Sequence, residues 1–475
     1  MTPREVIALT LRTGSGRVGM GFLIILVLVS LFVLIKFPSD FGPTRWNNPS
    51  EWANNPKAAP PMWAAFFDGN QHVKHLAMRM HEPSVVISNA LTERRSYNFD
   101  YKFAEGRLPT FLAFTVNNVR YVSRPPIVSL HVQRPDGSAG VIHQEVIRGP
   151  RSGEEPPYVR YQDTPFRLSL SSDRGVMAGL TQFFNEEYGV VLASSDLQDT
   201  IETAMFGVPS ADGSKFSPLV GTYRFSVRLD MNEQQDTVDD VQFIFGGSVY
   251  GAMGTDSLGR DLALGLLFGA PVALTIGVVT SLFTTVLGTT MGIVSGFSGG
   301  KTDILIQRFA DVWSNIPLLP VLIFLVFILG QRLWIVVLIM IVFGWPGLAI
   351  VVRSMVLQMR TGQLVEATRA IGASNKRIMF RHLLVQVAPF VFAQMIFFTP
   401  AAILAEAGLS FLGLGDPSIP TWGQILEHGF RTGAVYIGYW WWVLPPGLLI
   451  VATAMTFVLL TLGLEPVVNP RLRKT

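Results

Sequence analysis

The sequence predicts a polytopic α-helical membrane protein that carries a β-rich domain after its first span. Three observations predict this class. The 475 residues are 49% hydrophobic and only 15% charged, and their mean hydropathy of +0.38 is outside the usual range of soluble globular proteins. Long apolar runs recur near the N-terminus and in the C-terminal half. Between them, residues 37–250 contain short alternating runs that are typical of strands.

Six apolar stretches are candidates to cross a membrane. A spanning helix needs about 20 mainly apolar residues, because every backbone amide in hydrocarbon must be paired within its own segment. The first stretch lacks the small-x-small site of a cleaved signal peptide, so we expect an uncleaved anchor. The third stretch is the shortest. The expected spans are residues 19–35, 271–297, 316–330, 333–352, 387–405 and 443–464.

The basic residues orient these spans, because Lys and Arg gather on the cytoplasmic side of membrane proteins. Six spans place both termini on one side, which we assign to the cytoplasm, and residues 37–250 on the outer side of the cell membrane. The short connections on the outer side carry only Arg332 and Arg431 nearby. The residues assigned to the cytoplasm are Arg4, Arg12, Arg17, Lys301, Arg308, the basic residues of 353–381, Arg471, Arg473 and Lys474.

Residues 37–250 divide into an irregular leader and a β-rich domain. The leader "FPSDFGPTRWNNPSEWANNPKAAPPMW" is either a plain linker or a segment whose tryptophans lie at the headgroup level. The runs at 110–122, 127–147, 166–172 and 221–230 alternate apolar and polar residues. This alternation predicts strands with one buried face, and a series of short strands predicts a sandwich-like domain. Residues 177–189 predict a helix at its side.

No pattern in the sequence favours catalysis, nucleotide binding or a metal in this chain. "GFSGGKT" at 296–302 resembles a phosphate-binding loop, but Ser295 stands where the pattern needs glycine, and a span precedes it instead of a strand. His72, His75 and His81 lack carboxylate or thiolate partners at metal-ligand spacing. No pair of carboxylates is set for acid/base chemistry. The net charge of +3 does not favour nucleic acid, so we expect a non-catalytic subunit.

The connection between the fourth and fifth spans, about residues 361–385, is the strongest candidate site. "QLVEATRAI" has apolar residues at helical spacing, and Gly372 is placed to end this helix in a left-handed turn. Ser374 can cap a second, basic amphipathic helix. Two short helices around a glycine corner would form a cytoplasmic knob suited to docking. The alternative is that the basic residues only obey the charge rule and touch lipid headgroups.

This connection resembles the EAA loop of ABC importer permeases, whose pattern is Glu-Ala-Ala, three residues, Gly, nine residues, then Ile-x-Leu-Pro. In "EATRAIGASNKRIMFRHLL", Thr368 replaces the second Ala. His382 replaces the Ile, and His is usual at this position in the peptide-transport branch. Val385 replaces the Pro, and we expect Pro389 to break the helix instead. The matching residues are Glu366, Ala367, Gly372 and Leu384. The residues that the resemblance assigns to ATPase coupling are Glu366, Ala367, Arg369, Gly372, Ala373, Lys376, Arg377, Arg381 and His382.

Four further blocks resemble the dipeptide and oligopeptide permeases of the DppC/OppC type. They are "GTDSLGRD", "RFADVWSNIP", "EAGLSFLGLGDPSIPTWGQIL" and the tail "LEPVVNPRLRK", in which Glu465 and Asn469 take acidic positions. The likeness covers about residues 253–474 and the first span, whereas ordinary members have only a short connection in place of residues 37–250. The signature residues are Gly254, Thr255, Asp256, Gly259, Arg260, Asp261, Arg308, Asp311, Pro317, Glu406, Ser410, Phe411, Leu412, Gly413, Gly415, Trp422 and Gly423.

The resemblance implies a six-span permease of the type I ABC importer fold, with a β-rich extracytoplasmic insertion. Its domains would be residues 1–36, the insertion 37–250 and the permease core 251–475. It would pair with a second homologous permease as a heterodimer, with two cytoplasmic ATPases that hold ATP and Mg, and with an extracytoplasmic substrate-binding protein. Glu366 would orient the loop through a salt bridge or a helix-terminus contact. Glu406 would pair with a partner chain or lie at the interface.

The substrate and the wider class leave alternatives. The resemblance favours peptides, and related permeases also take up oligosaccharides or nickel. The insertion would dock or shield a binding protein, or act as a stabilising cap. A membrane-anchored β-domain receptor is a rival class that leaves the loop pattern unexplained. A secondary transporter would need ionisable residues deep in the spans and internal repeats, and the sequence has neither.

Overall fold

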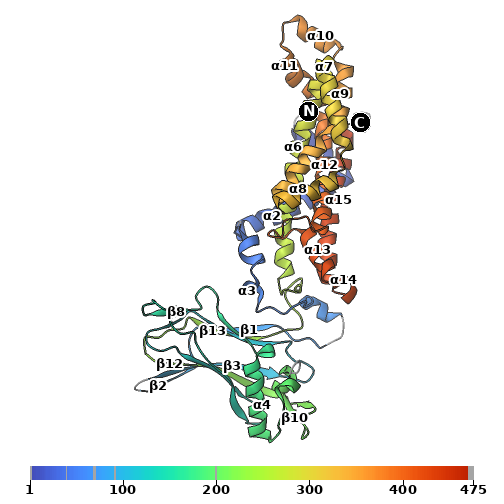
Figure 1. Cartoon of the computed structure of the whole chain (residues 1–475). Helices are drawn as coiled ribbons and strands as arrows, with labels where there is room; N and C mark the ends of the chain where they lie inside the picture. Colours follow the sequence, from blue (N-terminus) through green and yellow to red (C-terminus); the bar gives the residue numbers. More distant parts are fainter. Residues whose placement is uncertain (1–2, 39, 68–70, 90–91, 198–200, 469–475) are drawn as a thin grey trace. The chain divides into compact units, whose positions relative to one another are not determined.

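The computed structural model describes residues 3–38, 40–67, 71–89, 92–197 and 201–468. The chain forms two compact units (Figure 1). The helical unit comprises Met1–Asn48 and Leu262–Thr475, and the sandwich unit comprises Pro49–Asp261. The sequence-based boundaries, after residues 36 and 250, differ from these limits. The leader from Pro49 onward and the segment up to Asp261 both belong to the sandwich unit.

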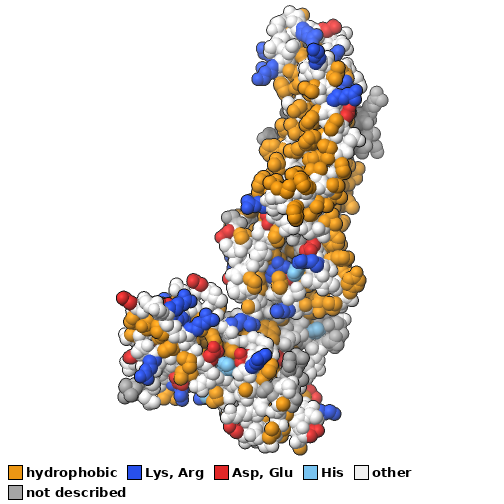
Figure 2. Space-filling model, viewed as in Figure 1, with side chains coloured by type: hydrophobic (Ala, Val, Ile, Leu, Met, Phe, Trp, Pro, Cys, Tyr) orange, Lys and Arg blue, Asp and Glu red, His pale blue; other side chains and the backbone are white. Residues whose placement is uncertain are grey.

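Five helical stretches among the described residues are long and apolar enough to cross a membrane. A sixth span exists if Gly300–Asn315 (α7) and Leu318–Leu329 (α8) count as one, although they bend by 81° at their junction. The space-filling view shows hydrophobic side chains gathered over the middle of this unit (Figure 2). The five are Gly14–Lys36 (α2), Leu262–Ser298 (α6), Leu333–Met359 (α9), Asn375–Phe411 and Trp440–Leu464, the last within Trp440–Val468 (α15).

A row of glycines on α6 lets α9 approach its backbone closely. Gly288, Gly292 and Gly296 recur at every fourth residue, so they share one helix face. A Cβ atom added at Gly292 would lie 2.7 Å from the Ala349 carbonyl oxygen and 2.7 Å from Val352 Cβ. The other two glycines meet α9 in the same way. Small residues at this spacing are a common basis of helix packing in membranes, where dispersion contacts replace the hydrophobic effect.

The helix break expected at Pro389 was wrong, whereas the third expected span coincides with one short helix. We expected Pro389 to break the helix before the fifth span, but Leu384–Phe411 (α12) runs through Pro389 and Pro400 without interruption. Proline is tolerated inside spans because neighbouring groups satisfy the carbonyl that it frees. The third expected span, residues 316–330, contains only the twelve-residue α8. Pro317 precedes α8 and has extended backbone angles, which separate α8 from α7.

The sandwich unit contains a four-stranded sheet in the order β1-β13-β4-β9 and a five-stranded sheet in the order β2-β3-β12-β6-β7. Two small pairs, β10-β11 and β5-β8, complete it. The strands in all of these sheets pair antiparallel. The strands are Leu76–Met80 (β1), Val85–Ser88 (β2), Glu93–Phe103 (β3), Leu112–Asn117 (β4), Val119–Tyr121 (β5), Ile127–Gln133 (β6), Ala139–Val146 (β7), Tyr158–Arg160 (β8), Phe166–Ser169 (β9), Gly207–Pro209 (β10), Phe216–Pro218 (β11), Gly221–Met231 (β12) and Asp240–Phe245 (β13).

Aromatic rings fill the space between the two large sheets. Phe243 on β13 lies 4.9 Å from Phe225 on β12 and 5.6 Å from Phe99 on β3, measured between ring centroids. Tyr101 stacks on Phe245 at 4.3 Å. All five rings are at most 6% exposed. Ring pairs at these separations add to the free energy of area burial, so the sandwich has an ample core of its own.

Each run predicted as strand contains strands, and the predicted side helix is Arg174–Tyr188 (α4). Asp173 caps α4 by accepting a hydrogen bond from the Val176 amide at 3.0 Å. The remaining α-helices among the described residues are short. They are Pro3–Arg12 (α1), Pro49–Trp52 (α3), Ile201–Met205 (α5), Gln363–Ala370 (α10), Asn375–Arg377 (α11), Trp422–Arg431 (α13) and Ala434–Ile437 (α14).

The glycine row gives a first prediction. Gly292→Val should lower the stability of the helical unit by about 1–3 kcal/mol, because the new side chain would force α6 and α9 apart. The measurement is the thermal unfolding midpoint of the purified chain in detergent. Gly21→Val is the matched control, since no atom lies within 4 Å of a Cβ atom added at Gly21. Equal midpoints for the two variants would show that the close approach does not matter.

Candidate functional site

The loop between α9 and α12 has the predicted glycine corner. Gly372 follows α10 with φ of +81°, which is the left-handed region that favours glycine. The Ser374 hydroxyl then accepts a hydrogen bond from the Arg377 amide at 3.4 Å. Both local predictions are confirmed. They depend on neighbouring residues only, which is why the sequence could provide them.

The second helix of the loop is not a separate element. After α11, residues Ile378–Leu383 form a π-helical turn that continues directly into α12. Ile378 and Leu383 are both fully buried and hold this turn in place. The expected knob is therefore one short helix, α10, and an extension of the fifth span. A force on the loop acts directly on α12.

An apolar cluster seats the loop on the ends of three spans. From the loop, Val365 on α10 is 1% exposed and Ile378 is 0% exposed. Because these residues sit in one continuous packed core, α10 cannot move without disturbing the spans beneath it. The cluster's other buried members are Ile293 and Phe297 of α6, Leu348, Val352 and Val356 of α9, and Leu383 and Val387 at the start of α12.

A polar network next to this cluster joins α6, α7 and α9. Arg353 on α9 donates to both carboxylate oxygens of Asp303 on α7, at 2.5 and 2.6 Å. The Ser295 hydroxyl on α6 donates to the same carboxylate at 2.5 Å and accepts from Gln307 at 3.0 Å. A two-pronged arginine–carboxylate contact fixes orientation as well as distance. The glycine-rich stretch 296–302 is thus a helix corner stabilised by its neighbours.

The charged residues of the loop remain largely exposed. Arg369 lies over the Phe297 ring at 5.4 Å, which links α10 to the end of α6. Glu366 is in the first turn of α10, where the helix dipole favours a negative charge. Among the described residues no ion pair involves Glu366, so of the two expected contacts the salt bridge is absent there. The other exposed charges are Lys376, Arg377 and Arg381, while His382 and Ala373 are half-buried and Ala367 is exposed.

A second polar cluster lies at the opposite end of the helical unit, where Figure 1 shows α13 and α14. Glu406 is 4% exposed and accepts a hydrogen bond from Ser410 at 2.7 Å. The Trp422 indole donates to the Leu266 carbonyl of α6 at 2.8 Å. A Cβ atom at Gly423 would lie 2.8 Å from the Ala407 Cα, so α13 packs directly on α12. The Glu406 carboxylate therefore has a hydrogen-bond partner, Ser410, within its own chain.

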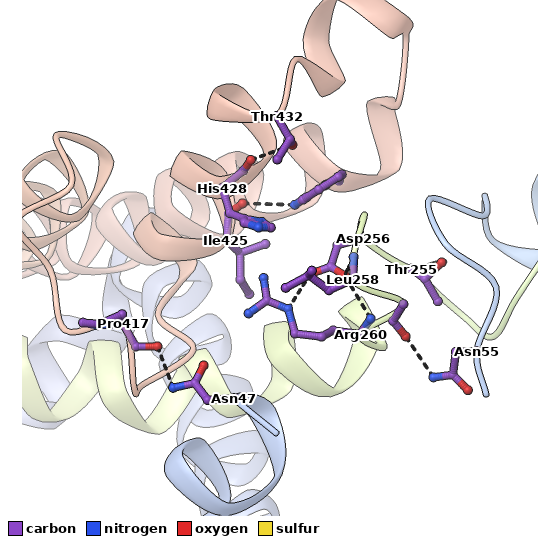
Figure 3. A network of polar contacts seen from close by, with 12 residues as sticks. Asn47, Asn55, Thr255, Asp256, Leu258, Arg260, Pro417, Ile425, His428 and Thr432 are labelled. Atoms are coloured by element: carbon purple, nitrogen blue, oxygen red, sulfur yellow. Dashed lines mark hydrogen bonds and ion pairs between the residues drawn. The ribbon is translucent and has the colours of Figure 1, made fainter. Parts of the chain in front are cut away.

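The rest of this signature block forms the turn between α12 and α13. Gly413 has φ of +77°, and its carbonyl accepts from Gln331 at 2.7 Å. Gly415 is buried against Ser410. Asn47 donates to the Pro417 carbonyl at 3.0 Å (Figure 3), which ties the chain after α2 to this turn. Phe411 and Leu412 are exposed beside it.

The stretch "GTDSLGRD" forms a clasp within the sandwich unit (Figure 3). The Asp256 carboxylate accepts from the amides of Leu258 and Arg260, both at 2.9 Å, and from the Arg260 guanidinium at 2.5 Å. The Thr255 hydroxyl donates to the Pro56 carbonyl at 2.7 Å. The Asn55 amide donates to the Gly259 carbonyl at 2.9 Å. This signature holds the incoming leader against the outgoing chain.

The other residues of the signature blocks lie at several separate places in the structure. Gly254 and Gly259 both have positive φ, and Thr255 forms a bridge with Asp261. Arg308 and Asp311 lie on α7 and form no ion pair with another described residue, and Pro317 precedes α8. In the tail block, Asn469, Arg471, Arg473 and Lys474 lie outside the described residues, as does the Glu465 side chain. No group of three or more metal-ligating residues occurs in the part of the chain that the structure describes.

Two residue sets escaped the sequence analysis. The glycine row on α6 could have been found from its four-residue spacing within an apolar stretch. The Asp303–Arg353 contact joins residues fifty positions apart. No local pattern identifies such a pair, although a lone aspartate between two spans is itself unusual enough to prompt a search for its partner.

The described helices define a protein with five, or up to six, candidate membrane spans. Comparison with known proteins gives the family. The profile described as binding-protein-dependent transport system inner membrane component matches residues 288–474. The chain is 36% identical over 222 residues to the dipeptide transport system permease protein DppC of Bacillus subtilis, covering 46% of this chain and 69% of that protein. It is 31% identical to the oligopeptide transport system permease protein OppC of the same organism, covering 54% and 81%.

The chain belongs to this family of transport permeases. Its role is that of a permease subunit in the membrane. The peptidoglycan transport system permease protein YejE of Agrobacterium fabrum is also similar, at 33% identity over 37% of this chain and 47% of that protein. A solved structure of inward-facing conformations of the MetNI methionine ABC transporter matches with a TM-score of 0.36 and 22% identity, covering 45% of this chain and 98% of that chain.

The polar network at the loop gives a second prediction. Arg353→Gln should lower the free energy of unfolding by about 1–2 kcal/mol, because Asp303 then loses its two charged hydrogen bonds at a partly exposed position. The measurement is again thermal unfolding in detergent. Lys301→Gln removes one positive charge from an exposed position two residues from Asp303 and is the control. An equal loss of unfolding free energy in both variants would mean that positive charge near Asp303, and not the hydrogen bonds from Arg353, stabilises the helical unit.

Proposed function

We propose that the chain is the permease subunit of an ATP-driven ABC importer for peptides. Family membership and the similarity to dipeptide and oligopeptide permeases support the substrate class. The observation that carries the coupling role is the α10 loop, seated by Val365 and Ile378 on the ends of α6, α9 and α12. Import of oligosaccharides or nickel is the alternative within the same class.

The loop acts as a rigid connection between an ATPase and the spans. Coupling requires that a displacement of the loop moves the membrane helices and is not lost to local bending of the loop. Three features resist such bending of the loop. They are the buried contacts of Val365, the Arg369–Phe297 contact and the continuous helix through α11 and α12. The exposed charges Glu366, Lys376 and Arg377 then provide docking electrostatics for a partner.

The complete importer would contain partners that supply what this chain lacks. These are a second homologous permease, two cytoplasmic ATPases that hold ATP and Mg, and an extracytoplasmic substrate-binding protein. The termini and the α10 loop lie in the cytoplasm in this proposal, and the sandwich unit lies outside the cell membrane. Excess Lys and Arg at the α10 loop support this orientation. The helical unit takes the type I importer fold that the family implies.

Hydroxyl groups on α6 are proposed to line the pathway. The Oγ1 atoms of Thr285 and Thr289 are buried and have no hydrogen-bond partner within the described structure. A cavity of about 320 Å³ between α6 and α12 is bordered by both threonines and by Phe380 and Phe392. Hydroxyl groups can form hydrogen bonds with the backbone of a peptide that moves through the pathway, and they hold it less tightly than an ionised side chain would.

The coupling role gives a third prediction. Gly372→Val should reduce peptide uptake by whole cells to the background level, because a β-branched side chain cannot adopt the left-handed turn without strain. Glu366→Lys should have a similar effect by reversing the exposed charge on α10. Membrane insertion, checked by immunoblot of washed membranes, should be unchanged in both.

Gly433→Ala provides the control for the glycine substitution. Gly433 also has a positive φ of +79° but lies between α13 and α14, at the other end of the helical unit. The Gly433→Ala variant should retain most of the peptide uptake. Normal uptake by the Gly372→Val variant would contradict the coupling assignment.

A fourth prediction concerns nucleotide. The purified chain alone should bind no ATP in equilibrium dialysis, because its glycine-rich stretch joins two helices and Ser295 replaces a required glycine. Stoichiometric binding of ATP to the chain without partners would contradict the assignment of ATP hydrolysis to other subunits.

A further inference from the structure

The sandwich unit contains a cavity of about 780 Å³ to which no role has yet been given. Its volume is in the range of small-molecule sites. The leader, the end of strand β9 and the segment that follows β13 form its walls. The lining residues are Pro49, Ala53, Asn55, Lys57, Ala58, Ala59, Thr110, Phe111, Arg167, Ser169, Ser172, Gly247, Ser248 and Leu258.

The charged side chains that line this cavity are all positive. Its lining includes Lys57 and Arg167, and none of the described lining residues is an aspartate or glutamate. Lys57 is exposed, whereas Arg167 is half-buried. Neither side chain forms an ion pair with another described residue. The cavity therefore presents two positive charges without a negative charge from its own lining.

Among the described residues, the groups that hold Arg167 in place are neutral. Its Nε donates to the Asn54 side-chain oxygen at 3.1 Å, and its Nη2 donates to the Ala53 carbonyl at 2.7 Å. Burial lowers the pKa of Arg167, and no neighbouring carboxylate offsets this effect. A partly buried cation without a counter-ion is costly, and proteins usually pair such a charge. An anionic ligand would supply the missing partner.

The remaining lining matches a ligand with polar and apolar parts. Ser169 stands two residues after Arg167 on β9, so both side chains leave the same face of the strand. Ser172 and Ser248 add further hydroxyls, and Phe111, Ala58 and Leu258 form an apolar wall. The Ser248 hydroxyl already accepts from the Val73 amide at 3.0 Å, which fixes its position.

We propose that this cavity binds the C-terminal carboxylate of a short peptide through Arg167 and Lys57. Resting on the proposed peptide transport, the inference gives the inserted domain a ligand-binding role of its own. A planar carboxylate can accept paired hydrogen bonds from a guanidinium. The last side chain of the peptide would lie against Phe111, and the serine hydroxyls would contact its backbone.

The test is isothermal titration of the purified full chain in detergent with Ala-Ala-Phe and with its C-terminal amide. The free acid should bind, and the amide should bind at least about tenfold more weakly, because it lacks the negative charge that would pair with half-buried Arg167. Arg167→Gln and Lys57→Gln should each weaken binding of the free acid and leave the amide unchanged. Lys57 is exposed, so its variant tests the site even if Arg167→Gln fails to fold.

Arg224→Gln is the matched control. Arg224 pairs with Asp100 on the five-stranded sheet, away from the residues that line the cavity, and its variant should bind the free acid normally. Equal affinity for acid and amide, or binding of neither, would overturn the proposal. Inorganic phosphate that binds at Arg167 while the free acid does not would also overturn it, by showing a simple anion site.

The outcome is separable from that of the proposed function. Peptide uptake by cells that contain the whole transporter measures the function, whereas titration of the isolated chain measures the cavity. Uptake without binding in the titration would reject the cavity and retain the importer. Binding without uptake would support the cavity and reject the importer.

Discussion

The close approach of α6 and α9 is the contact on which the helical unit depends. Gly288, Gly292 and Gly296 contribute no side chain of their own, so the backbone carbonyls and the Cβ atoms of α9 lie directly against the α6 backbone. This approach brings the end of α9 next to the α6–α7 corner, where Arg353 reaches Asp303. It also places Val352 and Val356 beneath α10. In a membrane, where water does not drive helices together, such fit is the main source of association.

The cost of charge in hydrocarbon explains where the polar groups lie. Ionised side chains are excluded from the middle of the spans unless they are paired. The polar networks of the helical unit accordingly form at its two ends, around Asp303 and around Glu406. One end carries the exposed loop with Arg369 and Lys376, and the other carries α13. A permease needs distinct surfaces on the two sides of the membrane, and the same constraint that stabilises the spans provides them.

The sequence could predict what neighbouring residues determine. The turn at Gly372 and the cap at Ser374 are set within a few residues, and the strands of β6 and β12 show clear alternation. Contacts between distant segments could not be predicted, such as β1 with β13 or Arg353 with Asp303. The break expected at Pro389 was wrong because tertiary packing in a span overrides the local preference of proline. The unpaired cation at Arg167 is likewise visible only once the fold brings β9 and the leader together.

The central claim is that the α10 loop contacts a cytoplasmic ATPase. The chain has no cysteine, so a single cysteine can be introduced without background. Ile371→Cys, at a position that is 84% exposed beside Gly372, should cross-link to an ATPase in native membranes, with the adduct identified by mass spectrometry. Tyr436→Cys, 82% exposed on α14 at the other end of the helical unit, should give no such adduct. Labelling of Ile371→Cys by a membrane-impermeant thiol reagent added outside intact cells, with no ATPase adduct, would contradict the account.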